Sequence, residues 1–343
     1  MNAPEYAFEI KDLAVEFDTF GGVVRAVRGV SYGVRPGSTL AVVGESGSGK
    51  SVTVQAVMGL IPKPPGRIVR GQALLRGVNI LDLPEAEARQ YRGRDIGMIF
   101  QDPMTSLNPT MKVGRQIAEP LVIHKGMSWA DAEKEALAIL DRTRIPEARK
   151  RATSYPFQFS GGMLQRVMIA IAIACKPQLL IADEPTTALD VTIQDQVLEL
   201  LRELQRDEGM SIILITHDLG VVARMADEVA VMYGGQIVEQ GPVDDIFHNS
   251  AHPYTLGLRR AMPGSGNSRL TPIAGVPPDL FSPPPGCAYA ARCPLTRKLC
   301  HEHLPPLYPV AANHSSRCFL QHPKAPCVRD ELPLFQVSHP QEN

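Results

Sequence analysis

The most constraining feature of the sequence is a glycine-rich loop set between a short β-prone run and a helical stretch. Residues 44–51 read GESGSGKS, which fits the phosphate-loop pattern G-x-x-x-x-G-K-[ST]. The loop follows the apolar run 39–43 and precedes the helical run 52–58. In this context the glycines let backbone N–H groups converge on phosphates. A glycine-rich turn that binds nothing would not need a strand before it and a helix after it. The loop therefore predicts a nucleotide-binding α/β fold.

The residues of this loop have separate predicted roles. Lys50 is expected to neutralise the β- and γ-phosphates of a nucleoside triphosphate, and Ser51 to give an oxygen ligand to Mg²⁺. The other residues expected to contact the nucleotide in this segment are Gly44, Ser46, Gly47, Ser48, Gly49 and Val52.

An acidic pair follows a second apolar run, at residues 178–182. A carboxylate at the end of a buried strand is costly unless it serves a cation, so Asp183 is expected to hold Mg²⁺. Glu184 comes one residue later, where it could polarise the water that attacks a γ-phosphate. An ordinary solvated acidic pair would be the preferred interpretation if the phosphate loop were missing.

Apolar β-prone runs alternate with helical patterns along the first 250 residues. The expected strands lie at 39–43, 95–100, 178–182, 211–216 and 228–233, and helical patterns at 129–142 and 193–206 lie between them. Such alternation predicts a mainly parallel sheet covered by helices.

Composition changes divide the chain into regions. Residues 1–250 are expected to form the nucleotide-binding domain, and the stretch 104–163, which lacks strong strand signals, a helical insertion within it. Proline becomes frequent after residue 251 and strand signals fade, so 251–330 is expected to be an appendage outside the sheet. The last residues, 331–343, are expected to be disordered.

Charge and hydropathy exclude two classes of protein. The chain has 35 Lys and Arg against 36 Asp and Glu, a net charge of −1, whereas a nucleic-acid-binding surface requires a basic excess. Its longest apolar run, 167–175, is far shorter than the ~20 residues of a membrane-spanning helix. We see no signal-peptide pattern at the N-terminus, so the chain is expected in the cytosol.

Four further motifs occur in a fixed order around the phosphate loop and the acidic pair. Residues 160–165 read SGGMLQ and precede an apolar helix; residues 100–103 read FQDP, 188–190 read ALD, and 216–218 read THD. Together with the first two motifs they resemble the signature motif, Q-loop, D-loop and switch histidine of ABC ATPases, over about residues 6–250. The signature motif departs from the family pattern, because Phe159 replaces its leucine and Met163 its glutamine.

This resemblance implies a RecA-like P-loop NTPase core with a helical subdomain, which binds and hydrolyses ATP. Gln101 would ligate Mg²⁺ and act in catalysis with Glu184 and His217. The family pairs two ATPase subunits, so Ser160, Gly161, Gly162 and Asp190 would serve the nucleotide held by the partner. Phe20 is the candidate for stacking on adenine, and Phe17 and Tyr32 are the alternatives.

The C-terminal region contains five of the six cysteines. In a cytosolic chain such clustering favours a metal site over disulfides, although the spacing does not match paired C-x₂-C zinc sites. Four thiolates suit either Zn²⁺ or a [4Fe–4S] cluster. The region resembles that of peptide-importer ATPases, which implies a [4Fe–4S] cluster on Cys287, Cys293, Cys300 and Cys318, with zinc as the alternative.

The resemblance to peptide importers also rests on residues 100–109 and 252–255. It implies a peripheral subunit at the cytoplasmic face of the inner membrane that energises di- or oligopeptide import. Its partners would be a second ATPase subunit, of another sequence or of its own, two membrane-spanning permeases and, indirectly, an extracytoplasmic binding protein. A nickel or other small-solute importer is the alternative. A soluble ABC ATPase acting on ribosomes or DNA is disfavoured by the single motif set and the near-neutral charge.

Overall fold

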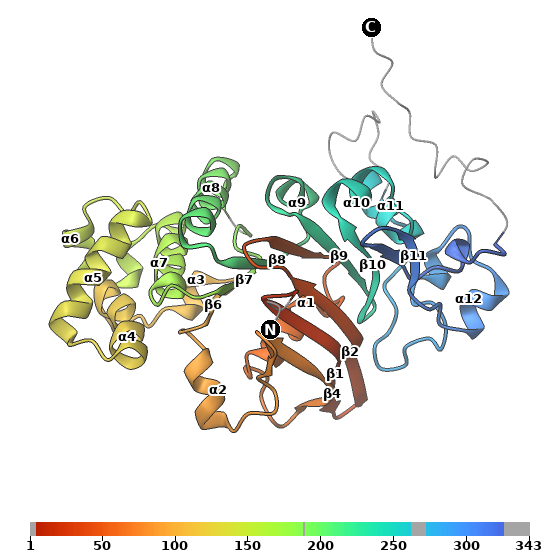
Figure 1. Ribbon diagram of the computed structural model, residues 1–343, viewed down its shortest axis with the longest axis horizontal. Helices are drawn as coiled ribbons and strands as arrows, with labels where there is room; N and C mark the ends of the chain where they lie inside the picture. The colour runs from red at the N-terminus through yellow and green to blue at the C-terminus, as the bar shows by residue number, and fades with distance from the viewer. Residues whose placement is uncertain (1–4, 188, 262–271, 326–343) are drawn as a thin grey trace, which may run out of the picture.

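The computed structural model describes residues 5–187, 189–261 and 272–325, and it contains one large and one small β-sheet. The large sheet has the strand order β11-β12-β10-β9-β3-β8-β7-β6 (Figure 1). Its strands are β3 (Thr39–Val43), β6 (Ile96–Ile99), β7 (Leu179–Asp183), β8 (Ser211–Thr216), β9 (Glu228–Tyr233), β10 (Gln236–Pro242), β11 (Tyr308–Ala311) and β12 (His314–Ser316).

The centre of the large sheet is parallel, as the sequence predicts. Strand β3 pairs in parallel with both β8 and β9, and β7 pairs in parallel with β6 and β8. Every residue of β3, β7 and β8 is buried, which explains why these segments are continuous apolar runs. The carboxyl ends of these strands carry the loops that hold the functional motifs.

The small sheet is antiparallel and was not predicted. It has the order β2-β1-β4-β5, with bounds β1 (Phe8–Thr19), β2 (Gly22–Val34), β4 (Gly66–Leu75) and β5 (Val78–Asn79). Helix α1 (Lys50–Val57) is buried with residues of both sheets in one core, which includes Phe8, Leu40 and Val54. The small sheet thus fixes the helix that follows the phosphate loop.

A helical layer covers the other end of the large sheet, and it contains the predicted insertion. No strand occurs among residues 104–163, all of which the structure describes. The helices here are α3 (Pro103–Ser106), α4 (Val113–Lys125), α5 (Trp129–Arg142), α6 (Ala148–Ala152), the 3₁₀ turn η1 (Pro156–Gln158) and α7 (Gly161–Ile173). Helix α7 shares a core with β7 through Val167 and Leu180, which ties this layer to the sheet.

The remaining helices flank the large sheet or follow it in the chain. They are α2 (Glu85–Tyr91), α8 (Val191–Glu208), α9 (Leu219–Met225), α10 (Val243–His248), α11 (Pro253–Arg260), η2 (Ala290–Arg292), α12 (Lys298–Glu302) and η3 (Phe319–Gln321). Helix α8 buries one apolar face, including Val197, Leu201 and Leu204, as its helical periodicity predicts.

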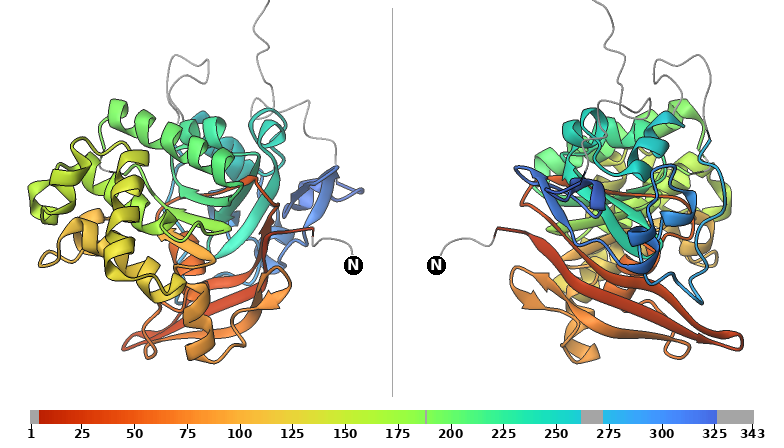
Figure 2. Two further views of the ribbon diagram at one scale, coloured as in Figure 1. Left: turned by 60° about the vertical axis from the view of Figure 1, so that its left-hand side comes forward. Right: turned by 90° about the vertical axis from the view of Figure 1, so that its right-hand side faces the viewer.

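The prediction that residues after 251 lie outside the sheet is wrong. Strand β12 pairs antiparallel with β10, so β12 and β11 extend the large sheet at one edge, as the right-hand view of Figure 2 shows. These strands are three and four residues long, and they contain His, Ser and Pro residues that give no strand signal. Tyr289 also packs in the same core as Tyr233 of β9 and Tyr254 of α11.

A buried carboxylate joins these C-terminal elements. Glu239 of β10 is fully buried and accepts hydrogen bonds from the backbone N–H groups of Ala251 (2.6 Å) and His252 (2.9 Å). His314 Nε2 of β12 donates a third, at 2.8 Å. A buried charge is tolerated when hydrogen bonds replace its water, and here these bonds hold β10, β12 and the start of α11 together.

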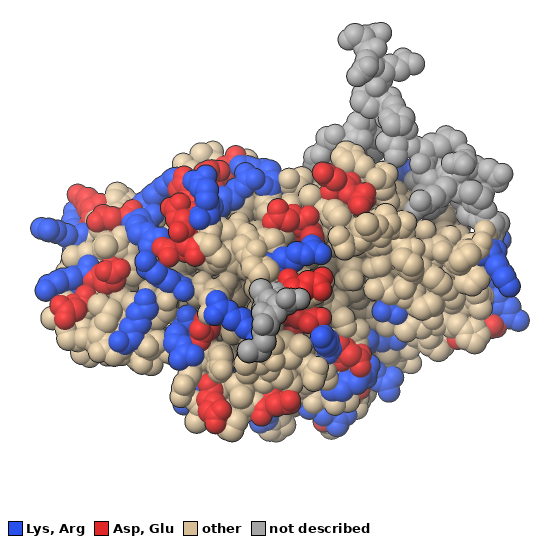
Figure 3. Space-filling view, in the orientation of Figure 1, with Lys and Arg blue, Asp and Glu red and all other residues tan. Residues whose placement is uncertain are grey.

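The surface in Figure 3 carries acidic and basic side chains interspersed over the helical layer. Within the residues that the structure describes, no helix combines the length and the apolar character that crossing a bilayer requires. The predicted tail at 331–343 and Cys327 lie outside those residues.

Candidate nucleotide-binding site

The phosphate loop connects β3 to α1, as predicted, and two of its glycines are sterically required. A Cβ on Gly44 would lie 2.1 Å from the backbone oxygen of Met232, and one on Gly49 would lie 2.5 Å from that of Ala26. Both glycines also have positive φ, 154° and 103°. Because Gly44 and Gly49 have no side chains, the loop can pack directly on β2 and β9, and its opposite side stays open to a ligand.

The other predicted loop contacts divide by exposure. Ser46 and Gly47 are exposed, Ser48 is buried, and Val52 is half-buried in the first turn of α1.

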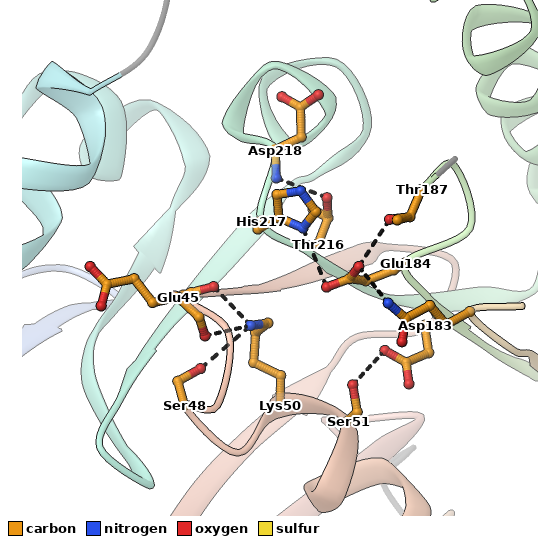
Figure 4. A network of polar contacts seen from close by, with 12 residues as sticks. Glu45, Ser48, Lys50, Ser51, Asp183, Glu184, Thr187, Thr216, His217 and Asp218 are labelled. Carbon is orange, nitrogen blue, oxygen red and sulfur yellow. Dashed lines mark hydrogen bonds and ion pairs between the residues drawn. The ribbon is translucent and has the colours of Figure 1, made fainter. Parts of the chain in front are cut away.

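Lys50 lies inside the curve of the loop. Its side chain is buried, and its Nζ donates to the backbone oxygens of Gly44 (2.8 Å) and Glu45 (2.9 Å), as Figure 4 shows. Burial lowers the pKa of Lys50, while the nearby carboxylates of Glu184 and Asp183 oppose this shift. The ammonium is therefore a poorly hydrated cation, ready to interact with an anion that enters the loop.

A hydroxyl and a carboxylate meet beside Lys50. Ser51 Oγ donates to Asp183 Oδ1 at 2.8 Å, and Asp183 is only 3% exposed. Burial raises the pKa of Asp183, and the hydrogen bond from Ser51 partly offsets that effect. The hydroxyl and the carboxylate are oxygen donors of the kind that Mg²⁺ prefers, so their position side by side is compatible with the Mg²⁺ site expected from the sequence.

The three predicted catalytic residues converge on the carboxylate of Glu184. Gln101 Nε2 donates to Glu184 Oε2 at 3.2 Å, and His217 Nδ1 lies 3.3 Å from Glu184 Oε1. These residues follow β6, β7 and β8, three neighbouring parallel strands, and the carboxyl ends of such strands meet at one edge of the sheet.

Two further features of Glu184 escaped the sequence analysis. Thr187 Oγ1 donates to Glu184 Oε2 at 2.9 Å, in the same turn of chain. Glu184 also has a left-handed backbone, with φ of 49°, which is a strained conformation for a residue with a side chain. Backbone strain of this kind is common at functional sites, and in Figure 4 the Glu184 carboxylate lies between His217 and Thr187.

The signature motif begins helix α7 but lies apart from the phosphate loop. Ser160 precedes the helix without a side-chain capping bond, and a Cβ on Gly161 would meet no atom within 4 Å. Ser160, Gly161 and Gly162 line a cavity of about 520 Å³ together with Asp190, which caps α8 through Ile193 N at 3.0 Å. Within the described part of the chain, no phosphate-loop residue lines this cavity.

The candidates for stacking on adenine differ in accessibility. Phe20 is fully exposed at the turn between β1 and β2, and Phe17 is half-buried against the core. Tyr32 is only 5% exposed, so it cannot stack on a base, and this alternative is wrong. A further aromatic side chain, Phe281, carries no sequence signal but packs against the same turn, with its ring 3.6 Å from a Cβ built on Gly21.

The four cysteines predicted as ligands line one cavity of about 420 Å³. Cys287, Cys293, Cys300 and Cys318 share its wall with apolar side chains such as Leu295. Burial raises the pKa of Cys287, that of Cys293 to about 11, and that of Cys318 to about 12. Among the described residues, no three His, Cys, Asp or Glu side chains are placed to hold a single metal ion.

The fold and the site together define the class. The large sheet carries the phosphate loop, the Ser51–Asp183 pair and the residues that meet at Glu184, while a separate helical layer carries the signature motif at the start of α7. This division is the architecture of an ABC ATPase cassette. The model of the ABC transporter family matches residues 27–187, and that of the oligopeptide/dipeptide transporter C-terminal region matches 238–300.

Comparison with known proteins narrows the class to a family. The chain is 56% identical to the oligopeptide transport ATP-binding protein OppD of Bacillus subtilis, over 93% of this chain and 90% of that protein. It is 52% identical to the dipeptide transport ATP-binding protein DppD of the same organism, over 94% and 96% of the two chains. The chain therefore belongs to the family of ATP-binding subunits of oligopeptide and dipeptide ABC transporters.

Solved structures give the same fold. A dimeric ATP-binding cassette in a post-hydrolysis state, bound to ADP and phosphate, superposes with a TM-score of 0.62 at 27% identity, covering 69% of this chain and 98% of its own. A component of a Clostridium perfringens ABC transporter complex gives a TM-score of 0.60 at 26% identity, over 75% and 96% of the two chains.

Proposed function

We propose that this chain hydrolyses ATP at the cytoplasmic face of the membrane to drive import of di- and oligopeptides. The observation that carries the proposal is the intact catalytic geometry at Glu184 in a chain 56% identical to an oligopeptide transport ATP-binding protein. Nickel or another small solute is the alternative cargo, and both relatives compared above are named for peptides.

The chemistry follows from the groups around Glu184. A water oxygen attacks the γ-phosphorus while Glu184 accepts a proton from that water. The bond from the γ-phosphorus to the bridging oxygen breaks, which releases ADP and phosphate. Gln101 and His217, which contact its two carboxylate oxygens, orient it. Lys50 stabilises the negative charge on the phosphates. Ser51, Asp183 and Gln101 are the residues that would hold Mg²⁺, which supplies further charge stabilisation when bound.

The signature motif acts in a second copy of the site. Ser160, Gly161 and Gly162 offer a hydroxyl and the N-terminus of α7 to a phosphate, but they line a cavity that excludes the phosphate loop of their own chain. A partner ATPase subunit would place its nucleotide against this cavity, and Asp190 lines the same cavity. The partner is a second ATPase subunit of different sequence or another copy of this chain.

The membrane partners would bind between the sheet and the helical layer. Residues 102–109 connect the two, and Met104 on α3 is 64% exposed there. Gln101 directly precedes this segment and contacts Glu184. A conformational change at the γ-phosphate can therefore be transmitted to residues 102–109 through Gln101. Two permease subunits, with an extracytoplasmic binding protein that selects the cargo, complete the proposed importer.

Deletion of the gene is expected to abolish uptake of short peptides. The test is growth of an amino-acid auxotroph on a dipeptide as its sole source, in a strain without a redundant importer. The control is the same strain carrying the wild-type gene on a plasmid. Normal growth of the deletion strain would contradict peptide cargo, and loss of nickel-dependent enzyme activity in its place would support the alternative.

A [4Fe–4S] cluster on Cys287, Cys293, Cys300 and Cys318 is the second part of the proposal. It is supported by the position of the four cysteines, which all line one cavity with largely apolar walls, although as they stand no three described His, Cys, Asp or Glu side chains are placed to hold one metal ion. Burial raises the pKa of Cys287, Cys293 and Cys318, so a cationic group is needed to hold these side chains as thiolates. Zinc is the alternative occupant.

Anaerobically purified protein is expected to contain about four irons per chain and to absorb as an iron–sulfur protein does. Cys293→Ser should remove the iron and the colour, because it deletes a ligand. Cys175→Ser is the matched control: this buried thiol contacts Pro120 O at 3.4 Å, far from the cavity in sequence, and its replacement should leave iron content unchanged. One zinc per chain without iron would support the alternative occupant, and metal-free protein would contradict both.

A further inference from the structure

Arg292 lies in the C-terminal extension, which is the described part of the appendage at 251–330. Each of its guanidinium N–H groups donates a hydrogen bond inside the protein. Its Nε donates to Ala274 O at 2.9 Å, and its Nη1 to Tyr233 Oη at 3.1 Å. Its Nη2 donates to Ile273 O at 3.2 Å. The two remaining donors go to Glu45 Oε2 at 2.7 Å and Oε1 at 3.0 Å, a bidentate pair. The arginine side chain is 5% exposed and that of Glu45 is 25% exposed, so the guanidinium is buried while the carboxylate is partly open to water.

Glu45 is the second residue of the phosphate loop, which makes this contact unusual in position. Its backbone oxygen accepts from Lys50 Nζ at 2.9 Å, and its backbone N–H donates to Tyr254 Oη at 2.9 Å. In Figure 4 its carboxylate points away from Lys50, out of the curve of the loop. The main chain of Glu45 thus belongs to the phosphate cradle, while its side chain is held from outside by Arg292.

We propose that Arg292 is a positioning residue of the ATP site: it neutralises the Glu45 carboxylate and holds it away from the triphosphate. This inference rests on the proposed ATP-binding function and assigns a role to the extension in it. A free carboxylate in the loop would repel a ligand that carries several negative charges, and the repulsion is strong where water is scarce. The bidentate pair also fixes the main chain of the loop in the form that accepts phosphates.

Arg292→Gln is expected to raise the Kd of the full-length chain for Mg·AMP-PNP by about tenfold, measured by isothermal titration. Arg292→Lys should raise it by about threefold, because it keeps the charge but loses the planar fork. In the assembled transporter, Arg292→Gln should raise KM for ATP more than it lowers kcat. Thermal unfolding without nucleotide reports separately on any loss of stability.

The decisive variant is Glu45→Gln combined with Arg292→Gln. Removing the carboxylate removes the repulsion, so the double variant should bind within about threefold of the wild type, and the two substitutions should be non-additive. A double variant as weak as Arg292→Gln, or weaker, would overturn the electrostatic role. Unchanged binding by Arg292→Gln would overturn the inference altogether.

Arg317→Gln is the matched control. Arg317 is a second semi-buried arginine of the extension, whose Nε donates to Ile237 O and Nη1 to Pro305 O, and it also precedes a cysteine. It makes no contact with the phosphate loop among its hydrogen bonds in the described residues, so its loss should leave Kd unchanged. Equal weakening by Arg292→Gln and Arg317→Gln would overturn the proposal in favour of general loosening. A wild-type chain that fails to bind Mg·AMP-PNP would instead contradict the proposed function itself.

Discussion

Glu184→Gln is expected to slow ATP hydrolysis by the assembled transporter by about 10²- to 10⁴-fold while ATP binding is retained. The amide keeps the size and the hydrogen-bonding reach of the carboxylate, so the contacts with Gln101 and Thr187 can persist. It cannot accept a proton from the attacking water, so the chemical step stalls. The measurement is phosphate release at saturating ATP, together with the Kd for Mg·ATP.

A second consequence follows for assembly. With ATP bound and not hydrolysed, the variant should accumulate as closed ATPase pairs, visible as a larger species in size-exclusion chromatography with Mg·ATP. Glu133→Gln is the control, because Glu133 lies on α5 in an exposed ion pair with Arg115 at 3.5 Å, and neither residue lines the signature-motif cavity. Turnover by Glu184→Gln at the wild-type rate would show that another group accepts the proton.

The parallel strands of the large sheet are the part of the fold that the sequence specifies most directly. Strands β3, β8 and β9 have the predicted bounds, because each is a continuous apolar run ended by a glycine, a polar motif or a turn. Buried strands of this kind need no neighbour to be recognised. The meeting of Gln101, Glu184 and His217 depends on β6, β7 and β8, because the carboxyl ends of neighbouring parallel strands bring the following loops together.

The antiparallel strands could not be predicted in the same way. Strand β1 shifts register against β2 between Ile10 and Leu13 and again between Val15 and Phe17. Each shift interrupts the alternation of apolar and polar residues that identifies a half-buried strand. Strand β12 reads His-Ser-Ser, and its place in the sheet depends on the bond from His314 to Glu239, 75 residues earlier in the chain.

The site contacts that escaped prediction are also long-range. Arg292 and Glu45 are 247 residues apart, and neither residue has a local pattern that marks the pair. Sequence patterns identify one segment as a phosphate loop and the other as a cysteine-rich appendage. A motif indicates what a segment binds, but it does not indicate which other segment packs beside it. Residues 251–330 are expected from the sequence to lie outside the sheet, whereas Arg292 places this region in direct contact with the phosphate loop.

Lys50→Ala is expected to raise the Kd for Mg·ATP by about 10²-fold, because it removes the buried cation at the centre of the site. The loss is larger than that of a surface charge for two reasons. Lys50 is only 5% exposed, so water screens the charge of its ammonium group weakly. The carboxylates of Asp183 and Glu184, which now favour its charged form, would face the phosphates without it.

Thermal unfolding with and without nucleotide measures this loss directly. At a ligand concentration of about 100 times Kd, binding stabilises the wild type by about 2.7 kcal/mol, and a 10²-fold higher Kd reduces this to about 0.4 kcal/mol. The rise in Tm with Mg·ATP should therefore nearly vanish in Lys50→Ala. Lys176→Ala is the control, because that lysine is 55% exposed in a surface pair with Glu208 at 3.7 Å. A full rise in Tm for Lys50→Ala would mean that the phosphates are held without this cation.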